Sequence, residues 1–282
     1  MTYQAHSRIA RHLGLAGSVL LLAATLGFGW ATRAGKFPLA SSQDRHPSMV
    51  QVQIPASEME LRWSLAIADP DPAPPVRPHT ENFDSIRKRL LANMAFDHYF
   101  PLAYWLFVLT LIPFALTSGT DERPGIVPMM FGAAVAVAIT TTVVFDYREN
   151  AGTLALLHAP NLATMSNGLQ ALIDPMRRAS QLKWGWLGAS MLLFGMMQVV
   201  RSGSNPSRGE AIRAIAAFSG GALGVLGSGL LGNAPVRGFF PGEMNFLGVV
   251  MFEVIIEAIP WPLRDGLLER RVARNPPQTH GV

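Results

Sequence analysis

Apolar residues fall in six blocks along the chain, separated by polar stretches. A transmembrane helix needs about 20 mainly apolar residues, with a range of about 17 to 25. The pattern therefore predicts an all-α integral membrane helix bundle with about six transmembrane helices. The last block is short and carries two glutamates, so a re-entrant or interfacial segment is its alternative. The blocks are Leu13–Thr32, Tyr99–Thr117, Ile126–Phe145, Trp184–Val200, Ala211–Gly232 and Met244–Pro260.

The first block has two interpretations. Arg8 and Arg11 precede it, as basic residues precede the apolar core of a secretory signal peptide. The block is long for such a core, and Arg33 and Lys36 follow it in place of a small-residue cleavage site. We therefore favour an uncleaved N-terminal anchor helix over residues 1–32.

Composition agrees with a membrane protein and excludes several kinds of site. Hydrophobic residues make up 49% of the chain and charged residues 15%, whereas soluble domains carry about 25% charged residues. The chain has no cysteine, which excludes disulfides, thiolate zinc sites and iron–sulfur clusters. The net charge of +4, with no basic run interleaved with aromatics, predicts no nucleic-acid partner.

Basic residues in short loops predict the orientation, because they are enriched on the cytoplasmic side. With the N-terminus inside, the inner side carries about twice as many as the short outer loops. We expect a bacterial inner-membrane protein with both termini cytoplasmic. The inner residues are Arg8, Arg11, Arg123, Arg201, Arg208, Arg213, Arg264, Arg270, Arg271 and Arg274, and the outer ones are Arg148, Arg177, Arg178, Lys183 and Arg237.

Residues 33–98 form the one long loop between predicted spans. Apolar and polar residues alternate around Val52 and from Met59 to Ile67, which predicts two short strands, paired as a hairpin. A proline-rich linker follows, and then a helix from about Thr80 to Ala95 that leads into the second span. The remaining units are a polar-cluster helix unit (99–200), a glycine-rich helix with a short glutamate-containing segment (201–271) and a tail (272–282).

The most informative polar residues follow the third block. Helical spacing places Thr142, Asp146, Glu149, Asn150 and Thr153 on one face, on a helix that continues to about His158. Asp97 and Lys183 lie at the starts of neighbouring spans, at the same predicted outer boundary. We predict a polar cluster of Asp97, Asp146, Glu149, Asn150 and Lys183, because ionisable groups at membrane depth usually pair or face a cavity. The alternative is that these charges only mark solvated span ends.

Two histidines lie near this cluster. His98 and His158, with Asp97 and Glu149, have the side-chain types of a divalent-metal site. Their spacing matches no metal motif, so they are weak candidates and we predict no metal and no cofactor. A histidine at a helix end is more often a polar cap.

The fifth block contains a ladder of small residues. Gly220, Gly224, Ser228 and Gly232 repeat every four residues and give one flat helix face. Such small-xxx-small faces let two helix backbones approach closely. The alternative is that glycine is simply frequent in transmembrane helices. The pattern does not say whether the partner helix is internal or in another chain.

The fifth and sixth blocks also carry opposite charges at the same predicted depth. Arg213 lies near the start of the fifth block, and Glu253 and Glu257 lie four residues apart in the sixth. We predict an Arg213–Glu257 ion pair, which would avoid two isolated charges in the membrane. If the sixth block lies flat, both glutamates would face water.

Three short stretches resemble a loose group of uncharacterised bacterial multi-pass membrane proteins. They are Phe96-Asp-His-Tyr-Phe-Pro-Leu-Ala-Tyr104, Phe145-Asp-Tyr-Arg-Glu-Asn150, with the Asp-x-x-Glu-Asn motif, and Leu182-Lys-Trp184. The resemblance covers about residues 90–200. It implies that Asp97, Asp146, Glu149, Asn150 and Lys183 belong to one unit, and it implies no activity.

Three classes of function are compatible with these features. The favoured one is an accessory or scaffolding subunit of a larger membrane complex, in contact with the lipid bilayer and with other membrane proteins or copies of itself. The alternative is a small transporter or an ion or proton pathway that uses the carboxylates, although no repeated halves are visible. The weakest is an enzyme with Asp146 or Glu149 as a general base. No sequence motif specifies a nucleophile, and the P-loop and dinucleotide-binding motifs are missing.

Overall fold

The computed structural model describes residues 3–34, 52–53, 55, 58–65, 83–117, 123–159, 162, 168–204, 206–228 and 248–256. The elements are helical throughout this part of the chain, so the all-α prediction is confirmed there. They are α1 (Tyr3–Ala34), α3 (Glu58–Ser64), α4 (Phe83–Asp97), α5 (Phe100–Thr117), α6 (Ile126–His158), α7 (Leu169–Ser202) and α8 (Arg208–Gly227), followed by a helical segment at 248–256.

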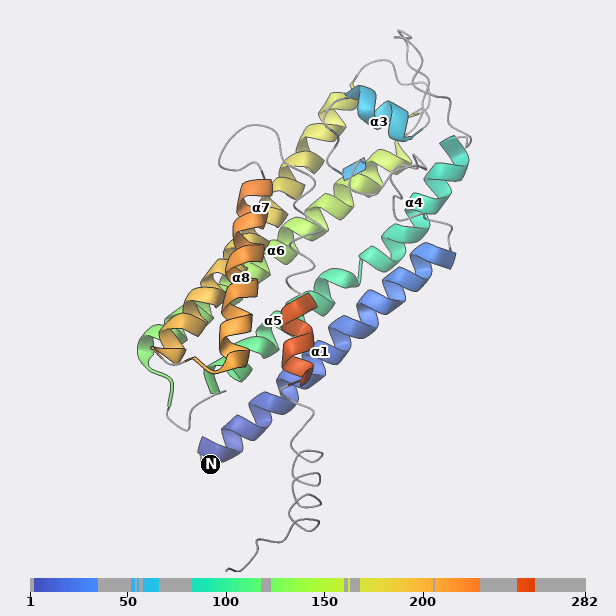
Figure 1. The fold of residues 1–282 in the computed structure, drawn as a ribbon. Coiled ribbons are helices and arrows are strands. Elements are labelled where there is room, and N and C mark those ends of the chain that lie inside the picture. Colours follow the sequence, from blue (N-terminus) through green and yellow to red (C-terminus); the bar gives the residue numbers. More distant parts are fainter. Residues whose placement is uncertain are drawn as a thin grey trace, which may run out of the picture.

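Long helices lie side by side and alternate in direction (Figure 1). α1 packs along α5, α6 pairs with α7 over a long contact, and α8 packs on α7. α1, α6 and α8 run one way, and α5 and α7 run the other way. The start of α1 therefore lies at the same end of the bundle as the ends of α5 and α7.

Four stretches within the described residues are long and apolar enough to cross a membrane. They are Ile9–Gly27, Phe83–Thr117, Ile126–His158 and Arg208–Gly227. The chain is therefore compatible with a membrane protein. The predicted spans in α7 and around residues 248–256 are not among these four, so the count of six stays a prediction.

α4 and α5 form one nearly continuous rod with a break at His98 and Tyr99. Pro101 explains the break, because it has no N–H to donate to the carbonyl of Asp97 four residues earlier. Asp97 is therefore the last residue of α4, next to the start of the apolar helix α5.

Two apolar cores lie one after the other along α6 and α7. The first joins α1, α5, α6, α7, α8 and residues 248–256, and includes Phe107, Phe114, Ile139 and Phe194. The second joins Val52, α3, α4 and the far ends of α6 and α7, and includes Leu61, Leu90 and Ile173. α6 has 33 residues, or about 50 Å at 1.5 Å per residue, which exceeds a hydrocarbon core of about 30 Å. The second core lies on this excess length.

The second predicted strand is wrong, because residues Glu58–Ser64 form helix α3. The alternating pattern also places Leu61 and Leu65 four residues apart, and both are fully buried in the second core. Arg62 pairs with Glu58 one turn earlier, at 2.6 Å between Nη2 and Oε1, which suits a helix. Most of the first predicted strand lies outside the described residues. Val52 is described, and it is helical.

Polar contacts secure the turn between α7 and α8. Ser207 and Glu210 form a capping box at the start of α8: the Ser207 amide donates to Glu210 Oε2 at 2.8 Å, and the Glu210 amide donates to Ser207 Oγ at 3.3 Å. Arg201 at the end of α7 donates from Nε to the Leu116 carbonyl at 3.0 Å. The capping box fixes the start of α8, and the Arg201 contact joins the end of α7 to the end of α5.

Glycines bring the backbones of α7 and α8 into close contact. A Cβ on Gly188 would lie 2.7 Å from the amide nitrogen of Val225 and 2.8 Å from the carbonyl oxygen of Gly221. A Cβ on Gly221 would lie 2.7 Å from the carbonyl oxygen of Gly188. Of the predicted ladder, Gly220, Gly224 and Ser228 are buried, and Gly232 lies outside the described residues. The register of the ladder therefore stays a prediction.

We expect Gly188→Ala to destabilise the bundle by about 1–3 kcal/mol, because the new methyl group would overlap backbone atoms that cannot move aside. Thermal unfolding of the purified chain, followed by tryptophan fluorescence, measures the effect. Gly27→Ala is the matched control, since no atom lies within 4 Å of its added Cβ. Equal Tm values for Gly188→Ala and the wild type would contradict the close α7–α8 contact.

Candidate functional site

A polar layer separates the two apolar cores. On α6, Val143 belongs to the first core and Leu156 to the second, and the buried residues Asp146, Glu149, Asn150 and Thr153 lie between them. On α7, Lys183 and Ser180 lie between Leu187 of the first core and Met176 of the second. The predicted polar face of α6 is thus turned inward, toward α7.

Lys183 is the central cation of this layer. Its ammonium group forms an ion pair with Glu149 Oε2 and lies 3.5 Å from Asp146 Oδ1. Glu149 is fully buried and Lys183 is nearly so. We call Asp146, Glu149 and Lys183 the α6–α7 charge cluster. It links two helices through charges that would each be costly to bury alone.

Two further side chains donate hydrogen bonds to the carboxylates, and sequence reasoning missed both as site residues. Tyr104 of α5 donates from its hydroxyl to Asp146 Oδ2 at 2.8 Å. Ser180 of α7 donates from Oγ to Glu149 Oε1 at 2.7 Å. The available signals were a buried phenol in an apolar span, which normally needs a partner, and a serine one helical turn before Lys183.

Asp97 and Asn150 lie at the edge of the charge cluster. Asp97 ends α4, is half-buried, and lies within electrostatic reach of Asp146 and Lys183 and beside the Asn150 amide. Asn150 is 2% exposed, and neither its amide nitrogen nor its amide oxygen has a hydrogen-bond partner of regular geometry. The five residues of the predicted polar cluster are therefore neighbours.

A second group of buried charges lies in the first core. Arg213 of α8 is fully buried, and its Nη1 lies 2.6 Å from Glu253 Oε2. Its Nε donates to Gln198 Oε1 of α7 at 3.3 Å, and its guanidinium carbon lies 5.2 Å from the centre of the Phe114 ring of α5. We call Arg213, Glu253 and Gln198 the Arg213 cluster. The partner of Arg213 here is Glu253, one turn before the predicted Glu257, which lies outside the described residues.

The two histidines contact aromatic rings and a backbone carbonyl. His98 is exposed and lies edge-on to Tyr99 and Tyr147, with ring centres 5.7 and 5.2 Å apart. Nδ1 of His158 lies 2.8 Å from the Leu154 carbonyl of its own helix. Within the described residues, no three His, Asp or Glu side chains converge as a metal-ligand set.

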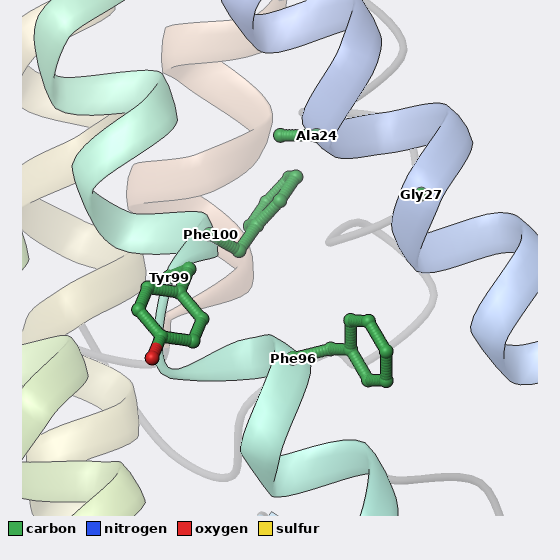
Figure 2. A pocket seen from close by; sticks show the side chains of 5 residues that line it. All are labelled: Ala24, Gly27, Phe96, Tyr99 and Phe100. Carbon is green, nitrogen blue, oxygen red and sulfur yellow. The ribbon is translucent and has the colours of Figure 1, made fainter.

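The pocket in Figure 2 lies beside the α4–α5 break rather than in the charge cluster. Its cavity volume is about 130 Å³, and it lies between α1 and the α4–α5 rod. Among the described residues, no charged side chain lines it. The lining residues are Ala24, Gly27, Phe96, Tyr99 and Phe100.

No known protein family, curated protein or solved structure matches the chain. The α6–α7 charge cluster and the Arg213 cluster are therefore the features that indicate its function.

We expect Lys183→Met to destabilise the chain by about 3–5 kcal/mol, because it leaves Asp146 and Glu149 buried without their cation. Thermal unfolding in lipid nanodiscs measures this loss. Lys88→Met is the control, since Lys88 is exposed on α4, and it should change the Tm little. A wild-type Tm for Lys183→Met would show that the ion pairs do not form.

Glu253→Gln should also destabilise the chain by about 3–5 kcal/mol, because it removes a carboxylate that pairs with the buried Arg213 guanidinium. Asp174→Asn, which breaks an exposed ion pair with Arg177, should cost no more than about 1 kcal/mol. A larger loss for Glu257→Gln than for Glu253→Gln would reverse the pairing in favour of Glu257.

Proposed function

We propose that the chain is an accessory or scaffolding subunit of a larger membrane complex. The observation that carries this proposal is that both groups of buried charges are paired within the chain. Lys183 pairs with carboxylates of α6, and Arg213 pairs with Glu253. Paired buried charges set how helices pack, which is the work of a structural element.

The arrangement of helices also suits a scaffold. α6 and α7 continue beyond one membrane thickness and carry a second packed core with α3 and α4. In the membrane part, α1 contacts mainly α5 and keeps large apolar side chains such as Val19 and Leu26 exposed. The second core with α3 and α4, and the exposed apolar face of α1, are features through which a subunit contacts lipid and neighbouring membrane proteins.

The proposed setting is a bacterial inner membrane with both termini in the cytoplasm. The basic residues of the short loops support this orientation. In that setting α3 and the second core lie toward the outer side, since α3 is at the bundle end opposite the start of α1. The resemblance to bacterial multi-pass proteins with the Asp-x-x-Glu-Asn motif points to the same polar unit.

An ion or proton pathway is the second candidate function. It is favoured by the surplus of carboxylates, since Asp97, Asp146 and Glu149 share one ammonium group, that of Lys183. Intramembrane carboxylates of this kind serve as proton relays or ion sites in transporters. The half-buried Asp97 would then be the entry to the charge cluster.

Gentle extraction from the native membrane, followed by mass analysis of intact particles, tests the scaffold proposal. We expect a particle that contains this chain and other membrane proteins in a fixed stoichiometry. A particle of this chain alone, across several mild detergents, would contradict the accessory role. A detergent that strips lipid from a known complex of the same membrane serves as the dissociation control.

The variants Asp146→Asn and Glu149→Gln separate the two functions. A structural role predicts a lower Tm and less assembled particle, because each change removes a partner of Lys183. A pathway predicts loss of ion or proton flux in proteoliposomes with an unchanged Tm. Asp174→Asn removes an exposed carboxylate of α7 and serves as the control in both assays.

A further inference from the structure

The corner formed by Asp97, Asp146 and Asn150 is short of positive charge and of hydrogen-bond donors. Lys183 is already engaged with Glu149 and Asp146, and Tyr104 with Asp146. Asp97 is reached only electrostatically by Lys183. His98, the next residue, is exposed. The carboxylates here outnumber the cations that the described side chains supply.

The buried amide of Asn150 is the independent sign that something else binds at this corner. Neither its oxygen nor its nitrogen has a hydrogen-bond partner of regular geometry, and Asp97 is close enough to accept a hydrogen bond from the amide nitrogen. An unpaired buried amide lowers the stability of a fold, so such groups are normally satisfied by protein, water or an ion. The amide oxygen and the neighbouring carboxylates of Asp97 and Asp146 are hard oxygen donors.

We propose that Asp97, Asp146 and the amide oxygen of Asn150 bind a hard, oxygen-ligated cation of the alkali or alkaline-earth class. Carboxylates, amide carbonyls and waters are the usual ligands of such ions, and two carboxylates with an amide oxygen leave room for water. The ion offsets the surplus negative charge and gives the Asn150 oxygen a partner. The ligands come from the end of α4 and the middle of α6, so the ion would tie these helices together.

The half-buried position of Asp97 gives the ion an access route from water to the site. Asp97 lies at the break between α4 and α5, at the edge of the buried polar layer, whereas Asn150 lies inside it. An ion arriving from the aqueous end would meet Asp97 first. This site is independent of whether the chain is an accessory subunit or a pathway, because it follows from the surplus of negative charge and from the unpaired amide of Asn150.

Ion titration of thermal stability tests the site. The full chain in phosphatidylcholine nanodiscs is freed of divalent ions with a chelator, and NaCl, KCl, MgCl₂ and CaCl₂ are then added separately. Choline chloride at equal ionic strength is the blank. We expect one of these ions to raise the Tm saturably, and Asn150→Ala and Asp97→Asn to weaken its apparent affinity about tenfold or more.

Asp174→Asn, an exposed carboxylate of α7, should respond as the wild type does. If Asn150→Ala fails to fold, the half-buried Asp97→Asn still tests the site. The proposal is overturned if no ion raises the wild-type Tm above the choline blank. It is also overturned if both variants respond like the wild type, or if the Tm responds to pH alone, which would mean that a proton takes the place of the ion.

Discussion

The pairing of Lys183 with Glu149 and Asp146 is the constraint on which the arrangement of the central helices depends. Burying an ammonium or a carboxylate without a partner costs several kcal/mol, comparable with much of the total stability of a fold. α6 and α7 must therefore meet in the one register that brings these groups together. Tyr104 adds α5 to the same level through Asp146. Sliding either helix by one turn would separate the charges.

This constraint also organises the molecule along its length. Apolar packing alone is non-directional, so two apolar cores on the same pair of helices would leave their relative position poorly specified. The polar layer between them specifies it. The Arg213 cluster has the same effect in the first core, where a buried guanidinium joins α8 to residues 248–256 and to Gln198 of α7. The close glycine contacts between α7 and α8 are not directional, and the charged contacts fix the register in which these helices pack.

The polar face of α6 was predictable because helical geometry alone places Asp146, Glu149 and Asn150 on one side. The side chains that contact this face were harder to predict. Lys183 was found through its position at a span boundary, whereas Tyr104 and Ser180 depend on the tertiary packing of α5 and α7. Residues 58–64 were mistaken for a strand because Leu61 and Leu65 satisfy both a period of two and a spacing of four. Glu253 and Glu257 share a face, so sequence spacing could not decide which of them meets Arg213.

A double-mutant cycle between Lys183 and Glu149 tests the central claim most directly. The unfolding free energies of the wild type, Lys183→Met, Glu149→Leu and the double variant are compared in the same nanodiscs. We expect the double variant to be more stable than Lys183→Met, with a coupling energy of about 1–3 kcal/mol, because removing both charges leaves fewer buried groups unpaired. Additive losses, with a coupling energy near zero, would show that the two side chains do not form the pair on which this account of the bundle depends.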